Sequence, residues 1–258
     1  MPLRIAALLM VLLIAPAASG ADYVVVPAGT FVSALAVDGS ASHMNMPAFE
    51  MRVEPVTQAE FLAFVSAHPQ WQRGRISALF AGPRYLQAWQ GPLALGASVQ
   101  PQQPVTQISW FAARAFCTSD HARLPNWYEW EYVAAADATR RDARGDSNRN
   151  QALLTAILAS SGSRPGEIGQ HRANIYGVRD INRLLWEWTG DYAAMFPNPD
   201  SRIPGVEALL ALCGGSALAF ADKSQYGLMM RVAALTALKP ADTAPRVGFR
   251  CVRDLSGK

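Results

Sequence analysis

The sequence predicts one α+β domain with few helices, short strands and much irregular structure. Helix-start signals at residues 57–60 and 126–129, and a valine-rich alternating stretch at 23–31, indicate both kinds of element. Long connections rich in Gly, Pro and Gln separate them. The chain has 258 residues, 50% hydrophobic and 17% charged, which suits one large domain with a real core better than two domains.

Residues 1–21 have the pattern of a secretory signal peptide. Arg4 supplies the positive start, residues 5–14 are an unbroken apolar run, and the small residues that follow allow cleavage after Gly20 or Ala21. The alternative is a transmembrane anchor, but the run is shorter than the roughly 20 apolar residues that a bilayer requires. A lipoprotein is excluded because the leader has no cysteine, and no later segment is apolar enough to span a membrane. We therefore expect residues 22–258 to form a single domain that is periplasmic or secreted.

The charge pattern excludes one large class of partners. The formal net charge is +3, one of these charges lies in the leader, and the basic residues are scattered rather than gathered in a stripe. Nucleic-acid binding requires such a stripe, so we expect none. In an oxidising compartment, the three cysteines (Cys117, Cys213 and Cys251) predict one disulfide and one cysteine left over, but spacing alone does not choose the pair.

The first elements follow from alternation and capping. Residues 23–31 predict a strand that ends near the turn residues Pro27-Ala28-Gly29, and residues 49–53 predict a second, short strand. Thr57 and Glu60 form a capping box, because the hydroxyl and the carboxylate can each satisfy an amide at a helix start. The helix that follows presents apolar residues at helical spacing. These are Phe61, Phe64 and Val65.

The middle of the chain alternates long loops with helices. Residues 66–104 show little periodicity and predict a long loop region that could form one wall of a pocket. Ser109 predicts the cap of a helix that runs through Cys117. Asn126, three residues before a glutamate, predicts another helix, to about Ala136.

The second half is harder to interpret. Residues 137–150 hold six Arg and Asp residues before Ser147 and predict a solvated loop, whereas residues 151–160 can form a short helix. Residues 161–205 are rich in turn formers. We find no clear periodicity after them until residues 247–252, which predict a final strand.

Short motifs occur along the chain in a fixed order. They are Pro-Val-Thr at 55–57, Ser-Trp at 109–110, Arg-Leu-Pro at 123–125, Glu-Trp-Glu at 129–131, Trp-Glu-Trp-Thr at 186–189, Gly-Gly-Ser at 214–216 and Gly-Phe-Arg-Cys at 248–251. Together they resemble the formylglycine-generating enzyme family, also called the sulfatase-modifying factor domain. The resemblance covers roughly residues 24 to 253. It implies a formylglycine-generating-enzyme-like α+β fold with a C-type-lectin-like core.

The resemblance also pairs the cysteines. It places Cys117 and Cys251 together, as a bridge between a helix and the last strand. The alternative is two buried free thiols. Cys213 is then unpaired, and a small buried residue is a commoner role for such a cysteine than a reactive thiol.

A calcium site is a further implication of the resemblance. By position it maps to the carboxylates of Asp180 and Glu187 and to the backbone carbonyls of Arg183 and Leu185. Several hard oxygens of this kind suit calcium. Arg183 stands where the family usually has glycine, so its cation either weakens binding or points outward. In the alternative interpretation, the two carboxylates simply accept hydrogen bonds from backbone amides.

The expected oxidation chemistry lacks its ligands. Formylglycine-generating members place two cysteines after Gly-Gly-Ser, and these thiolates bind copper(I). Residues 217–226 contain no cysteine here. We therefore do not expect formylglycine-generating activity. The polar residues left as candidates for other chemistry are Lys223, Ser224, Tyr226 and Arg231.

The sequence offers one other set of possible copper ligands. His43, Met44 and Met46 form a small cluster in the sequence, and imidazole and thioether groups can hold copper(I). However, strand alternation would separate His43 from Met44, and methionine is more often core filler. The sequence therefore does not favour copper.

Three functions remain. The chain is similar to short exported family members that accompany copper nitrite reductase in denitrification, which implies an accessory or maturation factor for a periplasmic enzyme. Its protein client would bind a groove formed by residues 66–104, 190–210 and 217–228. The alternative is a divergent oxidoreductase acting on a small molecule or peptide, like members in siderophore maturation that lack the cysteine pair. The third is a plain ligand-binding module.

Overall fold

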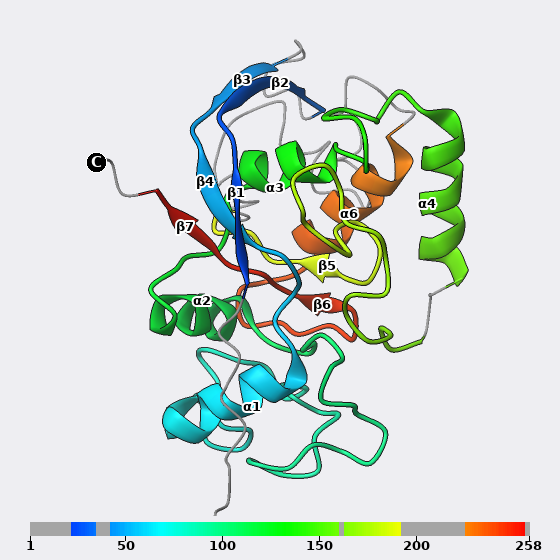
Figure 1. The fold of residues 1–258 in the computed structure, drawn as a ribbon. Coiled ribbons are helices and arrows are strands. Elements are labelled where there is room, and N and C mark those ends of the chain that lie inside the picture. Colours follow the sequence, from blue (N-terminus) through cyan, green and yellow to red (C-terminus); the bar gives the residue numbers. More distant parts are fainter. Residues whose placement is uncertain (1–21, 35–41, 160–162, 192–224, 256–258) are drawn as a thin grey trace, which may run out of the picture.

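The computed structural model describes residues 22–34, 42–159, 163–191 and 225–255 (Figure 1). The expected signal peptide lies outside these residues. The main sheet is antiparallel, with strand order β1–β4–β7. Its strands are β1 (Tyr23–Val26), β4 (Phe49–Arg52) and β7 (Val252–Asp254). The two ends of the domain therefore meet on either side of one early strand.

Two smaller strand pairs complete the β structure. The antiparallel ribbon of β2 (Gly29–Ser33) and β3 (Ser42–Met46) lies at the top of Figure 1. A short parallel pair joins β5 (Trp186–Glu187) to β6 (Val247–Gly248). The single strand expected over residues 23–31 is thus two strands, because Pro27 has no N–H to donate between them. The expected final strand is likewise divided, and β3 is the strand whose alternation was expected to separate His43 from Met44.

The early helices begin where the capping signals predict. Helix α1 (Gln58–Ala67) has the full Thr57–Glu60 capping box. The turn η1 (Pro69–Trp71) and an otherwise irregular region follow it, as expected for residues 66–104. In α2 (Trp110–Ser119), the Ser109 hydroxyl accepts from Ala112 N–H. The local sequence therefore sets these starts.

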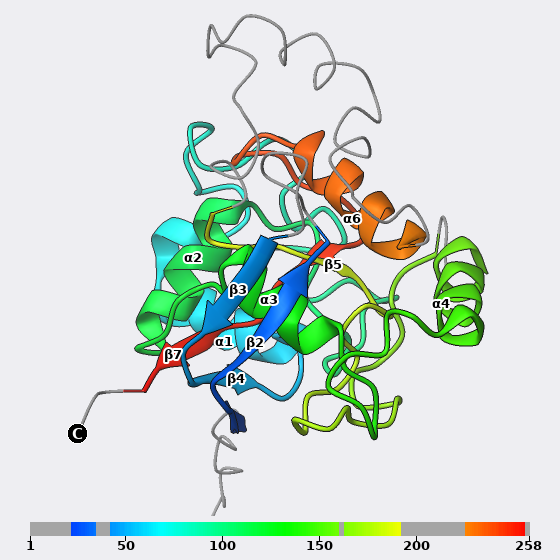
Figure 2. The same ribbon diagram turned by 90° about the horizontal axis from the view of Figure 1, so that it is seen from above.

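The later helices depart more from expectation. Helix α3 (Trp127–Ala134) starts at its predicted cap, but α4 (Ser147–Ala159) starts four residues before Gln151. Helix α6 (Tyr226–Thr236) was not expected, because its Gln225 cap makes no side-chain hydrogen bond and it carries a single charged residue. Figures 1 and 2 show α6 beside α4. No helix in the described ranges is both long and apolar enough to cross a membrane.

The core between α1 and α2 is aromatic. The rings of Phe61 and Phe116 stack at 5.9 Å between centroids, and Phe249 meets both edge-on. The disulfide Cys117–Cys251 lies fully buried in this cluster, with 5.6 Å between its Cα atoms, which confirms the pair that the resemblance implied. The bridge ties α2 to the segment that leads into β7.

A second core cluster lies between α3 and the sheet. Its fully buried members are Val26, Met51, Trp130, Val133 and Val252. Gly248 in β6 allows the C-terminal segment to pack closely against Leu185 and Val105. A Cβ at Gly248 would lie 2.3 Å from Leu185 Cδ1 and 2.5 Å from the Val105 carbonyl oxygen, so only glycine fits there.

Candidate functional site

A buried ion pair joins the two C-terminal motifs. Glu187 in β5 accepts from Arg250 Nε and Nη2, at 2.8 Å to each carboxylate oxygen, and from Trp130 Nε1 at 3.0 Å. Both charged side chains are at most 1% exposed. Arg250 also donates hydrogen bonds to three backbone carbonyls, those of Arg52, Val53 and Arg179. All the hydrogen-bonding groups of this ion pair are used within the protein. The pair therefore holds the neighbouring residues in place and has no group left to bind a ligand.

Arg231, one of the candidates from the sequence, lies next to this pair. Its guanidinium lies 3.5 Å from the centroid of the Trp130 ring, and Nη2 donates to the Glu187 carbonyl oxygen. Arg231 is 1% exposed, and this burial lowers its pKa to about 9, against the opposing effect of Glu187. Its Nε and Nη1 have no hydrogen-bond partner within the described part of the chain. Arg231 is therefore a buried cation held mainly by aromatic faces.

The other candidates are not gathered around Arg231. Tyr226 begins α6 and is 50% exposed, whereas Arg231 points into the core from the same helix. Lys223, Ser224 and Cys213 lie outside the described residues, as do Gly-Gly-Ser and, within the expected groove segments 190–210 and 217–228, residues 192–210 and 217–224.

Both carboxylates expected to bind calcium have protein partners. Asp180 Oδ1 lies 2.6 Å from His171 Nδ1, and Oδ2 accepts from Gly169 N–H at 2.5 Å. Glu187 is paired with Arg250, as described. The donors suit calcium in kind: two carboxylates, with the Arg183 and Leu185 carbonyls between them in the sequence. A bound ion would stiffen the turn between Asp180 and Glu187. Calcium stays a prediction, and binding by the expected set would require Asp180 to exchange His171, and Glu187 to exchange Arg250, for the metal.

The expected copper ligands do not converge. In β3, His43 pairs with Val32 and is exposed, whereas Met44 and Met46 belong to the opposite, core-facing side of the strand. Strand alternation therefore separates the imidazole from both thioethers. Across the residues that the structure describes, no three His, Cys, Asp or Glu side chains gather as a metal site.

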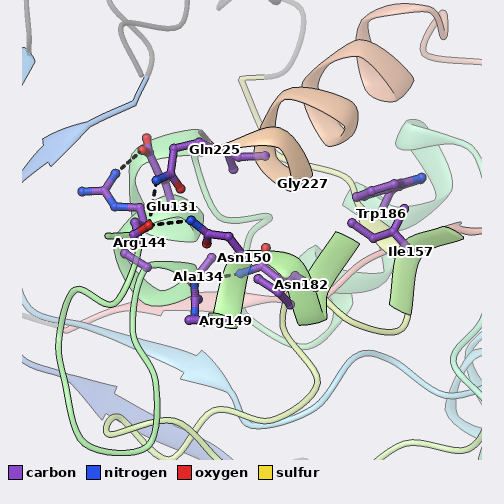
Figure 3. Close-up of a pocket in the computed structure, with 13 residues that line it drawn as sticks. Glu131, Ala134, Arg144, Arg149, Asn150, Ile157, Asn182, Trp186, Gln225 and Gly227 are labelled. Atoms are coloured by element: carbon purple, nitrogen blue, oxygen red, sulfur yellow. Dashed lines mark hydrogen bonds and ion pairs between the residues drawn. The ribbon is translucent and has the colours of Figure 1, made fainter. Parts of the chain in front are cut away.

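Glu131 lines a small pocket with both polar and apolar walls, which we call the Glu131 pocket (Figure 3). Its carboxylate accepts from Ala34 N–H at 2.6 Å, Ser33 Oγ at 2.6 Å, Trp127 Nε1 at 2.9 Å and Arg144 Nη1 at 2.9 Å. Burial raises the pKa of Glu131, and these donors partly offset the rise. The pocket volume is about 30 Å³, room for water rather than for a ligand. Glu131 is therefore a structural connection between β2, α3 and the loop before α4.

Sequence reasoning missed the cationic residues around this pocket. Arg144 was placed in a solvated loop, yet its side chain is only 13% exposed and its carbonyl accepts from Gln225 and Asn150. Arg149 in α4 donates to the Ala134 carbonyl oxygen at 2.8 Å, next to the same pocket. No local pattern marked these residues, because Arg144 precedes α4 and mixed charges surround it in the same loop.

The chain is similar in sequence to proteins named formylglycine-generating enzyme and hercynine oxygenase. A formylglycine-generating enzyme of Streptomyces coelicolor is 32% identical over 174 residues, covering 60% of this chain and 54% of that protein. A hercynine oxygenase of Mycolicibacterium smegmatis is 28% identical over 205 residues, covering 67% and 46%. The chain thus spans about half the length of these relatives. One of the similar proteins is named as inactive: a formylglycine-generating enzyme 2 of Bos taurus, 27% identical over 176 residues and covering 63% and 55%.

Solved structures and the family profile agree on the fold. The structure of PvdO from Pseudomonas aeruginosa superposes with a TM-score of 0.51, at 15% identity, covering 90% of this chain and 94% of that one. The profile of the sulfatase-modifying factor enzyme 1-like domain matches residues 12–255. The chain therefore belongs to the formylglycine-generating enzyme-like, or sulfatase-modifying factor enzyme 1-like, domain family.

Proposed function

We propose that this chain is a periplasmic accessory or maturation factor that binds a protein client, and that the client is a copper nitrite reductase. The observation that carries the client-binding role is an acid-free segment, residues 61–119, which contains four arginines and no Asp or Glu. It includes most of α1, all of α2 and the loops between them, which lie together at the lower end of the molecule in Figure 1. A surface of one charge sign favours a partner of the opposite sign.

The acid-free segment also exposes apolar side chains. Leu79 is 79% exposed, Leu93 52% and Phe80 44%. The Phe80 ring contacts Phe111 at 5.3 Å and Trp71 at 6.0 Å between centroids, so the apolar surface is continuous there. Exposed apolar patches of this kind commonly mark protein-binding sites.

Arginines border this apolar surface. Arg114 lies over the Trp110 ring, 5.4 Å from its centroid, and Trp110 in turn contacts Phe111. Arg75 and Arg84 are exposed on the adjoining loops. The turn around Pro240 lies next to this surface, because the Pro240 carbonyl accepts a hydrogen bond from Trp110 N–H. This turn contains one lysine and one aspartate, so it does not change the net charge of the surface. A client protein that fits this surface would therefore have an apolar patch bordered by carboxylates.

The cysteine count supports an accessory role over cysteine-copper oxidation. The chain has three cysteines, and two of them, Cys117 and Cys251, form the disulfide. A single thiol remains, whereas the formylglycine-generating chemistry of the family uses two thiolates on one copper(I) ion.

The experiment measures binding of the purified protein to copper-free nitrite reductase by biolayer interferometry, alongside nitrite reductase activity in a strain that lacks this gene. We expect micromolar binding that weakens with salt. Phe80→Ser and Arg84→Glu should each weaken it at least tenfold, whereas Arg141→Glu, the same charge change at an exposed arginine outside the segment, should not. Absence of binding together with normal nitrite reductase activity in the deletion strain would overturn the proposal.

The second candidate is a divergent oxidoreductase for a small molecule or peptide. Its support is the similarity to hercynine oxygenases, at 28% and 30% identity over 205 and 171 residues. The measurement is oxygen uptake by the purified protein after loading with iron(II) or copper(I), with hercynine as the probe. Uptake that depends on hercynine would favour this function, and no uptake would count against it.

A further inference from the structure

A second, larger cavity lies on the other side of Arg149 from the Glu131 pocket. We call it the arginine cleft. The turn after α3, the inner face of α4 and the loop before β5 form its walls, and its volume is about 470 Å³. Cavities of this size hold small-molecule ligands. The polar side chains on its walls are Asp137, Arg149, Gln170, His171, Arg172, Asn174, Asp180, Asn182 and Arg183.

Three of the residues that line the arginine cleft are arginines without carboxylate partners. Arg149, Arg172 and Arg183 form no ion pair within the described ranges. They come from different segments, since Arg149 belongs to α4 and the other two to the loop before β5. The fold therefore gathers like charges that the sequence keeps up to 34 residues apart, counted from Arg149 to Arg183 (183 − 149).

The two carboxylates on the walls offset only part of this positive charge. Asp137 is engaged by Arg140, which is not itself a wall residue, and by Thr139 N–H at 2.8 Å. Asp180 is engaged by Gly169 N–H and by His171 Nδ1. The walls carry three arginines and two aspartates, so the cleft keeps a formal net charge of +1 (3 − 2).

Arg149 is fixed before any ligand arrives. Its Nη2 donates to the Ala134 carbonyl at 2.8 Å, which holds the guanidinium at the boundary of the cleft. Burial lowers its pKa, and repulsion from Arg183 acts in the same direction although nearby aspartates oppose it. Repulsion between neighbouring arginines raises the free energy of the empty cleft, and an anion bound between them would lower it.

We propose that the arginine cleft binds a small multivalent oxyanion, a metabolite-sized molecule bearing two or more carboxylate or phosphate groups. Guanidinium groups suit both, because their paired N–H donors match the geometry of two oxygens. The volume exceeds what a single inorganic ion fills. The cleft does not include the acid-free segment, so this site would stand even if the client-binding role were wrong.

Isothermal titration calorimetry with two probes tests the site. Citrate represents polycarboxylates and pyrophosphate represents phosphates, each titrated at constant ionic strength, in a buffer without carboxylates or phosphates, into protein freed of divalent ions on a chelating resin. We expect at least one to bind with Kd below about 1 mM, equivalent to about 4 kcal/mol. Binding of citrate alone assigns a carboxylate ligand, binding of pyrophosphate alone a phosphate ligand, and binding of both an oxyanion site of mixed preference.

Two double variants, each of which removes two positive charges, decide whether the probes bind in the cleft. Arg172→Gln with Arg183→Gln removes two exposed cleft arginines and should weaken binding at least tenfold without lowering the melting temperature. Arg141→Gln with Arg164→Gln removes two exposed arginines elsewhere and should leave the affinity unchanged. Failure of both probes to bind, or an equal loss in both double variants, would overturn the proposal.

Discussion

Arg250 binds both carboxylate oxygens of Glu187, at 2.8 Å each, and so fastens the Trp-Glu-Trp-Thr motif to the Gly-Phe-Arg-Cys motif in the core. Neither side chain is more than 1% exposed. Trp130 of the Glu-Trp-Glu motif donates to the same carboxylate. Three motifs that look independent in the sequence are therefore one hydrogen-bonded unit, and losing one member leaves a buried charge without its partner.

The first prediction compares two buried arginines. Arg250→Met should lower the free energy of unfolding by about 3–5 kcal/mol, because Glu187 would remain charged and buried. Arg231→Met should change it by less than about 1.5 kcal/mol, because Arg231 makes one hydrogen bond and its remaining contacts are with aromatic faces that Met can also pack against. Urea denaturation followed by tryptophan fluorescence measures both. Equal losses would contradict the assignment of Arg250 as the main partner of Glu187.

The second prediction concerns the disulfide. The bridge from Cys117 to Cys251 closes a loop of 134 residues, so its removal frees a long stretch of the unfolded chain. Cys117→Ala with Cys251→Ala should lower the free energy of unfolding by about 2–5 kcal/mol. Dithiothreitol should have a similar effect on the wild type and none on the double variant. Cys213→Ala is the matched control and should keep wild-type sensitivity to dithiothreitol; an unchanged denaturation midpoint on reduction would refute the role of the bridge.

The sequence predicted local features well because local chemistry determines them. The capping box at Thr57 and Glu60 sets the start of α1 whatever the remainder of the chain does, and Asn126 does the same for α3. Motif order was enough to pair Cys117 with Cys251, since members of one family share their core contacts.

Features that depend on distant contacts could not be predicted. Helix α6 has no side-chain cap, and it has too few charged residues to mark a polar face in the sequence. The packing of Val232 and Leu235 against the core therefore defines it. Arg144 was expected in solvent because its neighbours are charged. Only the fold brings it to Glu131, 13 residues earlier in the chain. The arginine cleft was missed for the same reason, because its cations converge only in three dimensions.

The third prediction concerns acid stability. Hydrogen bonds from Arg123, together with its charge, hold the pKa of Asp254 below its usual value of 3.8. A carboxylate with a lowered folded-state pKa stabilises the protein above the unfolded value and loses that contribution as pH falls through the folded one. Asp254→Asn should therefore be less stable than the wild type at pH 6 and should converge with it toward pH 2.

The expected size of this effect is small. The Asp254 side chain is 73% exposed, so solvent screens the pair and the difference at pH 6 should stay below about 1 kcal/mol. Thermal melts between pH 2 and 6 measure it, and 1 M NaCl should reduce the difference further. A gap between the two proteins that widens as pH falls would show that the sign is wrong.

The fourth prediction tests calcium through its competitor. His171 Nδ1 lies 2.6 Å from Asp180 Oδ1, an oxygen that calcium would need. If the ion binds, His171→Ala should raise calcium affinity about tenfold, because a hydrogen bond to a charged group no longer has to be broken. The measurement is calorimetric titration with CaCl₂ after removal of EDTA, and MgCl₂ serves as the control ion because its octahedral demand fits such a set poorly. Asp180→Asn should weaken calcium binding in both backgrounds. If neither the wild type nor His171→Ala responds to calcium, Asp180 is held by His171 and Gly169 alone, and the turn before β5 is stabilised without a metal.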